Sequence, residues 1–539
     1  MYLNTLRYLK PSQFYHRISY NLRKPKNLKV PKLAVRSKPR EWIQPIGRKP
    51  RMPDSNTFTF LNLSKSFRET GWEGAGMDRL WRYHLHYFDD LNAECSKERL
   101  AIHRVLVDDW IRNNASFEGV GWEPYPTSLR IVNWIKWALA GNSLEPKWLE
   151  SLAMQTEWLS ERLEFHLLGN HLFANAKALL FSALFFEGEA THGWWKTGTE
   201  LVHRQMDEQI LGDGGHFERS PMYHGIVLED LLDLLNLFKA YEHAMPGMSD
   251  LCPKLLLKIS AMIDWLRAMI HPDEGIGFFN DSALEHEPEP GQIFSYASKL
   301  GFSVSESIEE ESKSLEQTGY VRLAKEHAVA LIDAAPIGPD YIPGHAHADT
   351  LSFELSIRGR RILVNGGTST YQNNLQRHKE RSTQSHNTVE VNGRNSSEVW
   401  GAFRVARRAK PFSRSCELGG NTASVSCSHD GYSRMCERIV HHRNWELQAG
   451  KFRILDRMEG RNAVGVARFH FHPNLQLKQR TDSIWQVEGY DHGVLFEVID
   501  GLGMVEPSTH SPAFGRILEN QCLSVSLING AAEVSITWD

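Results

Sequence analysis

Apolar residues recur at three- and four-residue spacing through the first half of the chain, between about residues 75 and 310. Clear examples of this helical period are Glu150–Leu163, His171–Phe186, Pro221–His243 and Pro253–Ile270. Short segments with Gly, Pro, Asp or Asn separate these stretches. A series of antiparallel helix pairs would form a bundle, a solenoid or a closed toroid, and periodicity alone does not choose among them.

The pattern changes near residue 318 to short segments of strand character. Tyr320–Ala324 and Ala328–Asp333 are predicted strands, and Thr350–Val364 predicts a hairpin that turns at Arg358 and Gly359. Further predicted strands follow at Thr388–Val391, Ala423–Cys427, Arg438–Trp445, Phe452–Asp456, Ala467–His472, Ile484–Val487, Val494–Val498, Leu523–Leu527 and Glu533–Thr537. Many short strands with turns between them predict an antiparallel β-sandwich.

The chain has 539 residues, which is too long for one hydrophobic core and indicates two or three domains. We expect a multidomain α+β protein with a basic N-terminal arm over residues 1–70. A helical domain is expected over residues 71–315 and a β-sandwich domain over residues 316–539. The acidic, Ser-rich stretch Ser303–Ser314 precedes the predicted boundary.

Charge distinguishes the beginning of the chain from the rest. The formal net charge is -4, which does not indicate a nucleic-acid partner. Residues 1–52, however, hold fourteen Lys or Arg against a single acid, Glu41. This arm either packs on the body by its aromatic residues, contacts a membrane surface or an assembly partner, or steers an acidic glycan.

Cysteine spacing and hydropathy bear on the compartment. The six cysteines form no CxxC pair, and free cysteines in a reducing compartment are the simplest interpretation. The beginning of the chain lacks the uninterrupted apolar stretch of a cleavable secretory signal, and Ala178–Phe186 is too short to span a bilayer. The expected location is therefore the cytoplasm or the inner-membrane surface.

Two clusters in the helical half carry candidate chemistry. Asn170 and His171 follow a glycine at the start of a predicted helix, where they serve either as an ordinary cap or as an amide and an imidazole for a carboxylate ligand. The segment from Glu218 to His224 opens another helix with Pro221 in its first turn. Tyr223 in this segment is either packing or, beside a histidine, a functional phenol.

Three further clusters lie in the strand-rich half. His345, His347 and Asp349 directly precede the predicted hairpin, and residues two apart in extended chain face the same side. Asn365 ends the hairpin, and His386 enters the next strand. The imidazoles of His347 and His386 with the oxygen of Asn365 suit one Zn²⁺, or a Ca²⁺, although an amide oxygen is a weaker ligand than a carboxylate.

In combination, these motifs resemble the heparinase II/III superfamily of bacterial polysaccharide lyases. The resemblance covers roughly residues 70–510 and is densest from His345 through Ala409. The run Ser396–Ala409 is similar to the subset often encoded with exopolysaccharide or capsule assembly functions. The resemblance implies an N-terminal α/α toroid, a C-terminal antiparallel β-sandwich, and elimination across C4–C5 of a uronic acid in an acidic polysaccharide or oligosaccharide.

The resemblance also implies roles for individual residues. Asn170 or His171 would neutralise the uronate carboxylate, and Tyr223 would take or return a proton. His345 would lie on the sandwich side of the cleft. Metal-binding members of the family place three ligands at the positions of His347, Asn365 and His386, with an Asp where this chain has Asn365.

Such an elimination has definite chemical requirements. The proton at C5 of a uronate is weakly acidic, and donors that bind the carboxylate let negative charge spread into it. A base must then reach C5 while an acid protonates the departing O4. Tyr223 can serve in either role and His345 can share the work, provided that two residues 122 positions apart meet across one cleft.

Rings combined with cations suggest substrate contacts in the helical half. The candidates are Trp81, His84, Trp122, Tyr125, Arg130 and His224. Such residues stack on sugars and hold carboxylates, or else they pack helix against helix with Arg130 paired to a neighbouring acid. Two other functions compete with a lyase: a glycoside hydrolase using Glu218 and Asp349 as its two carboxylates, and a non-catalytic glycan-binding or assembly protein.

Overall fold

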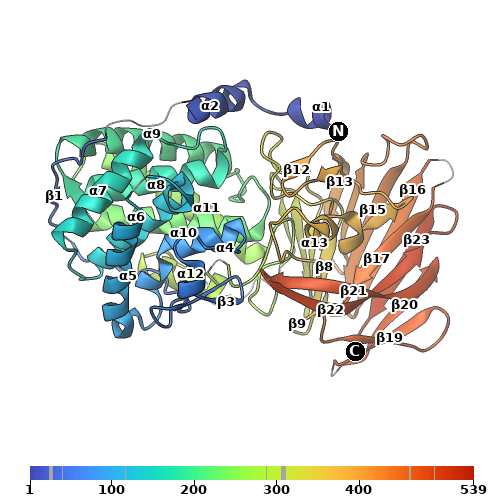
Figure 1. Cartoon of the computed structure of the whole chain (residues 1–539). Helices are drawn as coiled ribbons and strands as arrows, with labels where there is room; N and C mark the ends of the chain where they lie inside the picture. Colours follow the sequence, from blue (N-terminus) through green and yellow to red (C-terminus); the bar gives the residue numbers. More distant parts are fainter. Residues whose placement is uncertain are drawn as a thin grey trace.

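The computed structural model describes residues 1–22, 28–38, 40–115, 117–286, 288–304, 311–460, 463–490 and 492–539. It consists of a helical domain, a domain of antiparallel sheets, and an N-terminal arm that lies against both (Figure 1). The last helix of the helical domain ends at Lys299, and the first strand of the sheet domain begins at Lys313.

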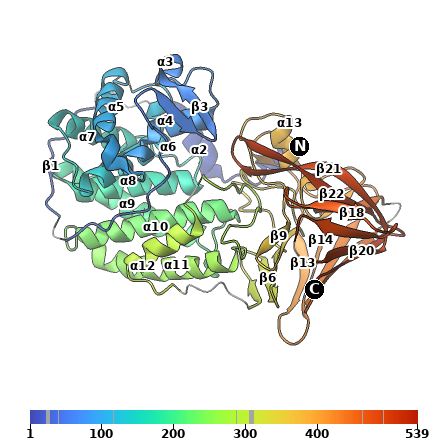
Figure 2. The same cartoon turned by 90° about the horizontal axis from the view of Figure 1, so that it is seen from below.

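The helical domain contains most of the helices of the described chain. They are α3 (Phe67–Thr70), α4 (Arg79–Tyr87), α5 (Leu100–Asn113), α6 (Pro124–Leu139), α7 (Pro146–Ser160), α8 (Gly169–Phe185), α9 (Glu189–Gln209), α10 (Pro221–Ala240), α11 (Met248–Ala268) and α12 (Pro290–Lys299). Short 3-10 helices lie at Asp89–Asn92, Ser96–Arg99, Val120–Trp122 and Thr383–Ser385. Helices adjacent in sequence lie side by side, as α8 with α9 and α10 with α11 (Figure 2).

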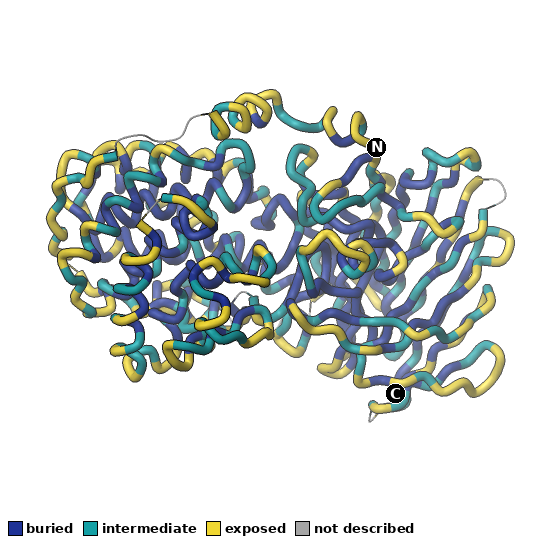
Figure 3. The backbone as a smooth tube through the Cα atoms, in the orientation of Figure 1, coloured by how far each residue is buried: buried dark blue, intermediate teal, exposed yellow. Residues whose placement is uncertain are grey.

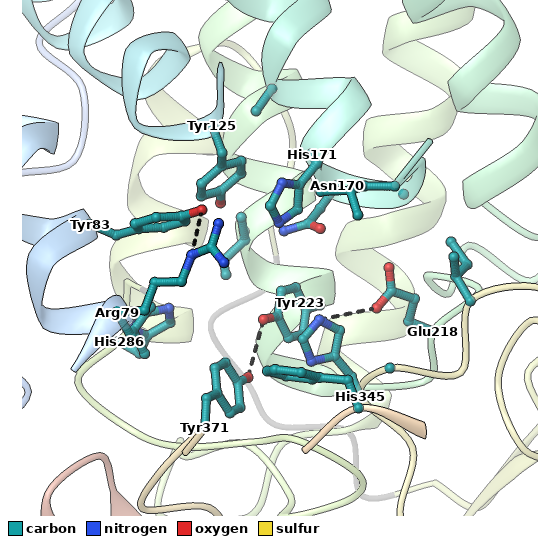
Figure 4. A pocket seen from close by; sticks show the side chains of 18 of the residues that line it. Arg79, Tyr83, Tyr125, Asn170, His171, Glu218, Tyr223, His286, His345 and Tyr371 are labelled. Atoms are coloured by element: carbon teal, nitrogen blue, oxygen red, sulfur yellow. Dashed lines mark hydrogen bonds and ion pairs between the residues drawn. The ribbon is translucent and has the colours of Figure 1, made fainter. Parts of the chain in front are cut away.

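Helices α8 and α10 form the centre of this domain. Every residue of α8 except His171 is buried, as an apolar run without a polar face requires. In α10 the buried residues likewise lie on all sides of the helix. His171, which is only partly buried, lies in the first turn of α8, and this turn faces the sheet domain (Figures 1 and 4).

The sheet domain contains three larger sheets, and all pairings between their strands are antiparallel. The first contains β5 (Lys313–Leu315), β6 (Tyr320–Lys325), β7 (Ala328–Asp333), β8 (Phe353–Ile357) and β9 (Arg360–Leu363), in that order. The second runs in the order β10 (Val389–Val391), β17 (Gly465–His470), β22 (Arg516–Ser526) and β21 (Leu502–Ala513). The third runs in the order β13 (Pro411–Glu417), β14 (Ala423–His429), β15 (Val440–Gln448), β16 (Lys451–Glu459), β23 (Ala531–Thr537), β20 (Val494–Asp500), β19 (Ile484–Glu488) and β18 (Gln476–Gln479).

The sheets enclose one apolar core. The ring of Phe353 in β8 lies 5.6 Å from that of Phe452 in β16 and 6.3 Å from that of Phe469 in β17, so all three sheets contribute to it. A bridge between Leu363 and Phe471 joins the five-stranded and four-stranded sheets. Along strands such as β16, buried residues face this core and alternate with residues that face outward (Figure 3).

The structure confirms the predicted helical domain followed by antiparallel sheets. The predicted hairpin is present as β8 and β9, and Arg358 and Gly359 at its tip have φ of 46° and 82°, as a tight two-residue turn requires. A small ribbon of β11 (Val399–Trp400) and β12 (Arg404–Val405) and the helix α13 (Leu375–Glu380) lie beside the sheets near the helical domain.

The N-terminal arm forms helices α1 (Tyr2–Leu6) and α2 (Pro11–Leu22), which are exposed over much of their surface (Figure 3). Strand β1 (Ala34–Val35) then pairs with β4 (Phe186–Glu187), and β2 (Thr57–Phe60) pairs with β3 (Leu63–Ser66). All six cysteines are free. None of the helices that the structure describes has the length and hydropathy to cross a membrane.

Candidate active site

A cavity of about 1290 Å³ lies where the two domains and the arm meet. Its walls come from α4, α6, α8 and α10 of the helical domain, and from the segment before β8 and the segment after β9 in the sheet domain (Figure 4). The arm adds residues of α1 and α2. The cavity therefore lies between parts of the chain that are far apart in sequence.

Tyr223 and His345 meet in this cavity. Tyr223 lies in the first turn of α10, where the Oγ of Ser220 accepts the backbone N–H of Tyr223 at 3.2 Å. His345 lies in the segment between β7 and β8. The two rings have their centroids 4.0 Å apart, with 32° between the planes. The structure thus brings the tyrosine of the helical half and the histidine of the sheet half onto one surface.

Asp281 holds His345 in a defined orientation. Its Oδ2 lies 2.9 Å from Nδ1 of His345 and 2.7 Å from Nη2 of Arg377, and its Oδ1 lies 2.8 Å from Nε2 of His347. Burial raises the pKa of Asp281, but Arg377 and the two histidines outweigh it and hold the pKa well below the ordinary value. The ionised carboxylate can only accept, so Nδ1 of His345 carries the proton and Nε2 carries the lone pair.

Tyr223 is a protonated phenol at neutral pH. Its hydroxyl lies 3.1 Å from the hydroxyl of Tyr371 (Figure 4). Burial, and then the nearby Tyr371, raise the pKa of Tyr223 well above its ordinary value. The pKa of Tyr371 is raised as well, by burial and by the charge of Asp281. At rest the site therefore contains a proton donor, Tyr223, whose ring packs on the imidazole of His345.

Glu218 faces His345 from the helical side. Its Oε2 lies 3.8 Å from Nε2 of His345 and has no hydrogen-bond partner among the residues described. Burial raises the pKa of Glu218, against the opposing effect of His345 and His171. The carboxyl group therefore holds its proton more tightly than an exposed glutamate would.

Asn170 and His171 lie opposite this pair, at the start of α8 (Figure 4). The His171 ring packs on Tyr125 with centroids 4.4 Å apart, and its Nδ1 lies 3.1 Å from Oε1 of Glu164. The helix starts at Gly169 with φ of 58°, and a Cβ there would lie 3.0 Å from Oε1 of Glu218. A glycine is therefore needed to bring Asn170 and His171 close to the rest of the site.

Three of the six predicted substrate contacts, Trp81, His84 and Tyr125, are among the residues that line the cavity. Tyr125 lies in its wall, and burial raises the pKa of its hydroxyl. His84 also lies in the wall, where burial and neighbouring cationic groups lower its pKa well below the ordinary value. His84 packs on Phe60 with ring centroids 5.7 Å apart. Both lie where a sugar bound in the cavity would pass.

Trp81 borders the cavity as a buried ring, and the other three predicted contacts are corrected by their burial. Trp81 has no exposed surface, and its Nε1 donates to the carbonyl of Leu63 at 3.2 Å. Trp122, Arg130 and His224 are outside the cavity lining. They are bound to the carbonyls of Asn114, Gly121 and Met262, respectively. These rings and the guanidinium pack helix against helix. The prediction failed because an apolar helix face indicates burial but does not indicate which buried residues border a cavity.

The three predicted metal ligands each contact other groups of the protein. Nδ1 of His347 lies 3.2 Å from Nε2 of His386, and Nε2 of His347 is bound to Asp281, so both of its nitrogens are engaged. The Asn365 oxygen accepts the N–H of Asn387 at 3.0 Å instead. In the described ranges no group of three or more His, Cys, Asp or Glu side chains is arranged to hold a metal. The predicted Zn²⁺ or Ca²⁺ would have to compete with these contacts, and no step below is derived through a metal.

Sequence reasoning missed several residues of the site. Asp281 follows a run of aromatic residues in a loop, and Tyr371 lies in an irregular segment after β9, so neither position has a periodic or motif signal. Arg377 lies in the short α13. Arg79 donates to Glu123 at 2.5 Å and lines the cavity (Figure 4).

A helical domain followed by antiparallel sheets is an architecture found in solved lyases. A structure described as heparinase III superposes with a TM-score of 0.67 at 17% identity, covering 87% of this chain and 79% of that one. The heparan sulfate lyase HepC of Pedobacter heparinus has a TM-score of 0.59 at 18% identity, covering 98% and 87%. The chondroitin AC lyase of Streptomyces coelicolor has a TM-score of 0.50 at 11% identity, covering 90% and 77%.

The family follows from the sequence comparisons. The family described as heparinase II/III N-terminus matches residues 75–300, and the heparinase II/III-like C-terminal family matches residues 308–538. The chain belongs to the heparinase II/III-like family. A heparin-sulfate lyase of Bacteroides stercoris is 25% identical over 424 residues, which cover 72% of this chain and 60% of the relative. One of Pedobacter heparinus is 23% identical over 364 residues, covering 63% and 50%. The chain thus spans between half and three fifths of these relatives.

Proposed function

We propose that this protein is a polysaccharide lyase that cleaves a uronate-containing, glycosaminoglycan-like glycan by β-elimination. The observation that carries the proposal is the contact between Tyr223 and His345, with Asp281 directing the lone pair of His345 away from itself. The family relatives named heparin-sulfate lyase support an acidic glycan as the substrate class. The proposed link to exopolysaccharide or capsule metabolism stays a prediction, as does a cytoplasmic or inner-membrane location.

The first step of the proposed reaction is proton removal from C5. The Nε2 lone pair of His345 takes the C5 proton, and the electron pair of the C5–H bond moves into the uronate carboxylate as an enediolate. Negative charge that develops in the uronate carboxylate is stabilised by the amide of Asn170 and the imidazole of His171, which lie at the positive end of α8. Their position at a helix start makes them suitable for this role.

The second step is departure of the glycosidic oxygen. The enediolate electron pair forms the C4=C5 double bond as the C4–O4 bond breaks, and O4 takes the hydroxyl proton of Tyr223, which its raised pKa keeps in place until that moment. Loss of this proton leaves a tyrosinate beside a protonated His345. Because the two rings are in contact, the proton then passes from His345 to Tyr223 and restores the starting state.

The carboxylate pair that the sequence suggested for a hydrolase is not formed in the cavity. Glu218 lines the cavity, but Asp349 does not. Asp349 is fully buried, and its Oδ2 accepts the backbone N–H of Asn280 at 3.0 Å. Two carboxyl groups on opposite sides of one glycosidic bond are therefore not available from this pair.

The test is a panel of acidic glycans, with heparan sulfate, chondroitin sulfate, hyaluronan and alginate, followed by ultraviolet absorbance. Elimination leaves a conjugated C4=C5 double bond that absorbs, whereas hydrolysis leaves new reducing ends without it. Tyr223→Phe should reduce kcat by about 10²- to 10⁴-fold. The matched control is Tyr432→Phe, which removes a buried hydroxyl that donates to the carbonyl of Val389 at 2.7 Å, outside the cavity.

Three results would contradict the proposal. Reducing ends without absorbance would favour a hydrolase. Binding of a glycan without cleavage would favour a non-catalytic glycan-binding or assembly protein. Equal losses in Tyr223→Phe and Tyr432→Phe would place the effect of Tyr223 in folding and not in chemistry.

A further inference from the structure

The N-terminal arm connects the two domains across the cavity. Helix α2 is held on the helical domain, where Lys10 Nζ lies 2.6 Å from Oε1 of Glu208 and the guanidinium of Arg162 lies 3.6 Å from the ring centre of Tyr20. Helix α1 reaches the sheet domain, where Nε1 of Trp400 donates to Thr5 Oγ1 at 3.1 Å. Figure 1 shows this crossing from one domain to the other.

The arm also forms part of the cavity wall. Its lining residues are Tyr2, Thr5, Leu6, Leu9, Gln13, Phe14 and Arg17. The backbone next to them is fixed from the sheet domain, because Gln13 Nε2 donates to the carbonyl of Tyr341 at 3.2 Å. The arm is therefore in a position to touch whatever the cavity binds.

Two arginines at this wall have no acidic partner. Arg17 of α2 and Arg404 of β12 both line the cavity and are exposed. Within the described ranges, neither side chain forms an ion pair with a carboxylate. The other Lys and Arg that line the cavity do have acidic partners, as Arg408 has in Asp340 and Arg79 has in Glu123.

The two arginines face the same cavity, and the charge of one acts on the other. Burial, and then the charge of Arg17, lower the pKa of Arg404. The charge of Arg17 acts in the same direction on His166, whose pKa is lowered chiefly by burial. Two like charges from different domains, facing one cavity without a counterion, are a common arrangement for binding an anionic ligand.

The lysines in the wall of the cavity, in contrast to these arginines, are paired with acids. Lys177 Nζ lies 2.7 Å from Oδ1 of Asp230 and 2.5 Å from Oδ2 of Asp233, and Asp233 also pairs with Lys136. These lysines are neutralised by the protein itself. The cations that remain available to a ligand are therefore Arg17 of the arm and Arg404 of β12, and not these lysines.

We infer that Arg17 and Arg404 form an anion-binding subsite that takes the carboxylate or sulfate of a sugar next to the one that is cleaved, so that the arm is part of the substrate-binding surface. This inference rests on the proposed function for its substrate class. Planar guanidinium groups suit both anions, because each offers paired N–H donors to two oxygens. The subsite binds a neighbouring sugar and takes no part in proton transfer at C5.

The test compares Arg17→Gln and Arg404→Gln with the wild type on heparan sulfate oligosaccharides of increasing length and on their desulfated counterparts. We expect each substitution to raise KM by about tenfold on the longer oligosaccharides, with kcat within about twofold. The effect should shrink as salt is added, because the contact is exposed. Arg17→Lys should restore part of the loss.

Arg7→Gln is the matched control. Arg7 lies on the same arm and is exposed, but its Nη2 donates to Tyr8 Oη at 2.7 Å and it is outside the cavity lining. A rise in KM that is equal in Arg7→Gln and Arg17→Gln would overturn the subsite, since it would reflect general attraction to a basic arm. An unchanged KM in both Arg17→Gln and Arg404→Gln would overturn it as well.

Two further results separate the subsite from the proposed function and identify its ligand. If the wild type produces no unsaturated product, the lyase proposal fails, while calorimetric binding of the same oligosaccharides to wild type and variants still tests the subsite. If desulfation removes the difference between wild type and Arg17→Gln, the bound group is a sulfate. If the difference persists, the bound group is a carboxylate.

Discussion

Replacing Asp281 by Asn tests how the carboxylate sets the proton position of His345. The ionised carboxylate requires the proton on Nδ1, whereas an amide can present its NH₂ to Nδ1 and so move the proton to Nε2. His345 would then lose the lone pair that faces the cavity. We expect kcat of Asp281→Asn to fall by about 10²- to 10⁴-fold, the range for loss of a general base.

Stability must be separated from chemistry, because Asp281 also pairs with the buried Arg377. Removing one partner of a buried ion pair costs about 3–5 kcal/mol in the free energy of unfolding. The chain contains a matched control in Asp456, which is also buried. Asp456 lies 2.7 Å from Nε2 of His441 and is bound twice by Arg443, which with its other partners holds its pKa at about 2 although burial raises it.

Asp281→Asn and Asp456→Asn therefore break equivalent His–Asp–Arg clusters, of which only the first touches the cavity. Thermal unfolding should show comparable losses of stability in both variants. Initial rates of unsaturated product, measured at a temperature where both are folded, should be lost only in Asp281→Asn. Full kcat in Asp281→Asn, or an equal loss in Asp456→Asn, would refute the assigned orientation of His345.

Other predictions concern stability, the start of α8 and metal content. Burial lowers the pKa of His86 and His224 to about 3. Each therefore takes up a proton on unfolding below about pH 6.5, and the pair should lose about 3 kcal/mol of stability by pH 5.5. Scanning calorimetry should show this loss of stability, and His224→Gln should make stability less dependent on pH. An unchanged pH dependence in His224→Gln would contradict the lowered pKa of His224. Gly169→Ala should lower kcat at least about tenfold, because its Cβ would lie 3.0 Å from Glu218 and φ is 58°, whereas Gly193→Ala, with nothing within 4 Å, should keep full activity. Equal effects of the two glycine substitutions would argue against a tight approach at Gly169. Elemental analysis should find less than one equivalent of zinc or calcium, because the Asn365 oxygen already accepts a backbone N–H. A full equivalent of metal in the wild type that is lost in His386→Ala would contradict this and show that Asn365 exchanges that N–H for the metal.

Periodicity predicted the elements whose burial is regular. The apolar run of α8 and the alternation along β14, β15 and β16 are strong patterns, and the structure contains these elements. Strand β21 was not predicted, because Pro507 and Pro512 are typical of turns. The strand tolerates them because it is the outer strand of its sheet, where fewer backbone N–H groups need a partner.

The site could be predicted only where side chains cluster in sequence. Tyr223 and His345 each lie beside other titratable residues, and such clusters are visible without a structure. Asp281 and Tyr371 come from irregular segments, and their roles depend on contacts 64 and 148 positions away in sequence. Arg130, in contrast, was predicted as a substrate contact and is not one. Its guanidinium donates to Gln155 and to backbone carbonyls inside the helical core.

The most direct test of the account is a crystal structure of Tyr223→Phe with an uncleaved uronate oligosaccharide. The account predicts that C5 of one uronate lies about 3.5 Å from Nε2 of His345, with O4 of the same sugar beside the position of the missing hydroxyl. Its carboxylate should face Asn170 and His171. A sugar bound with C5 remote from His345, or with its carboxylate turned toward Glu218, would contradict elimination by this pair.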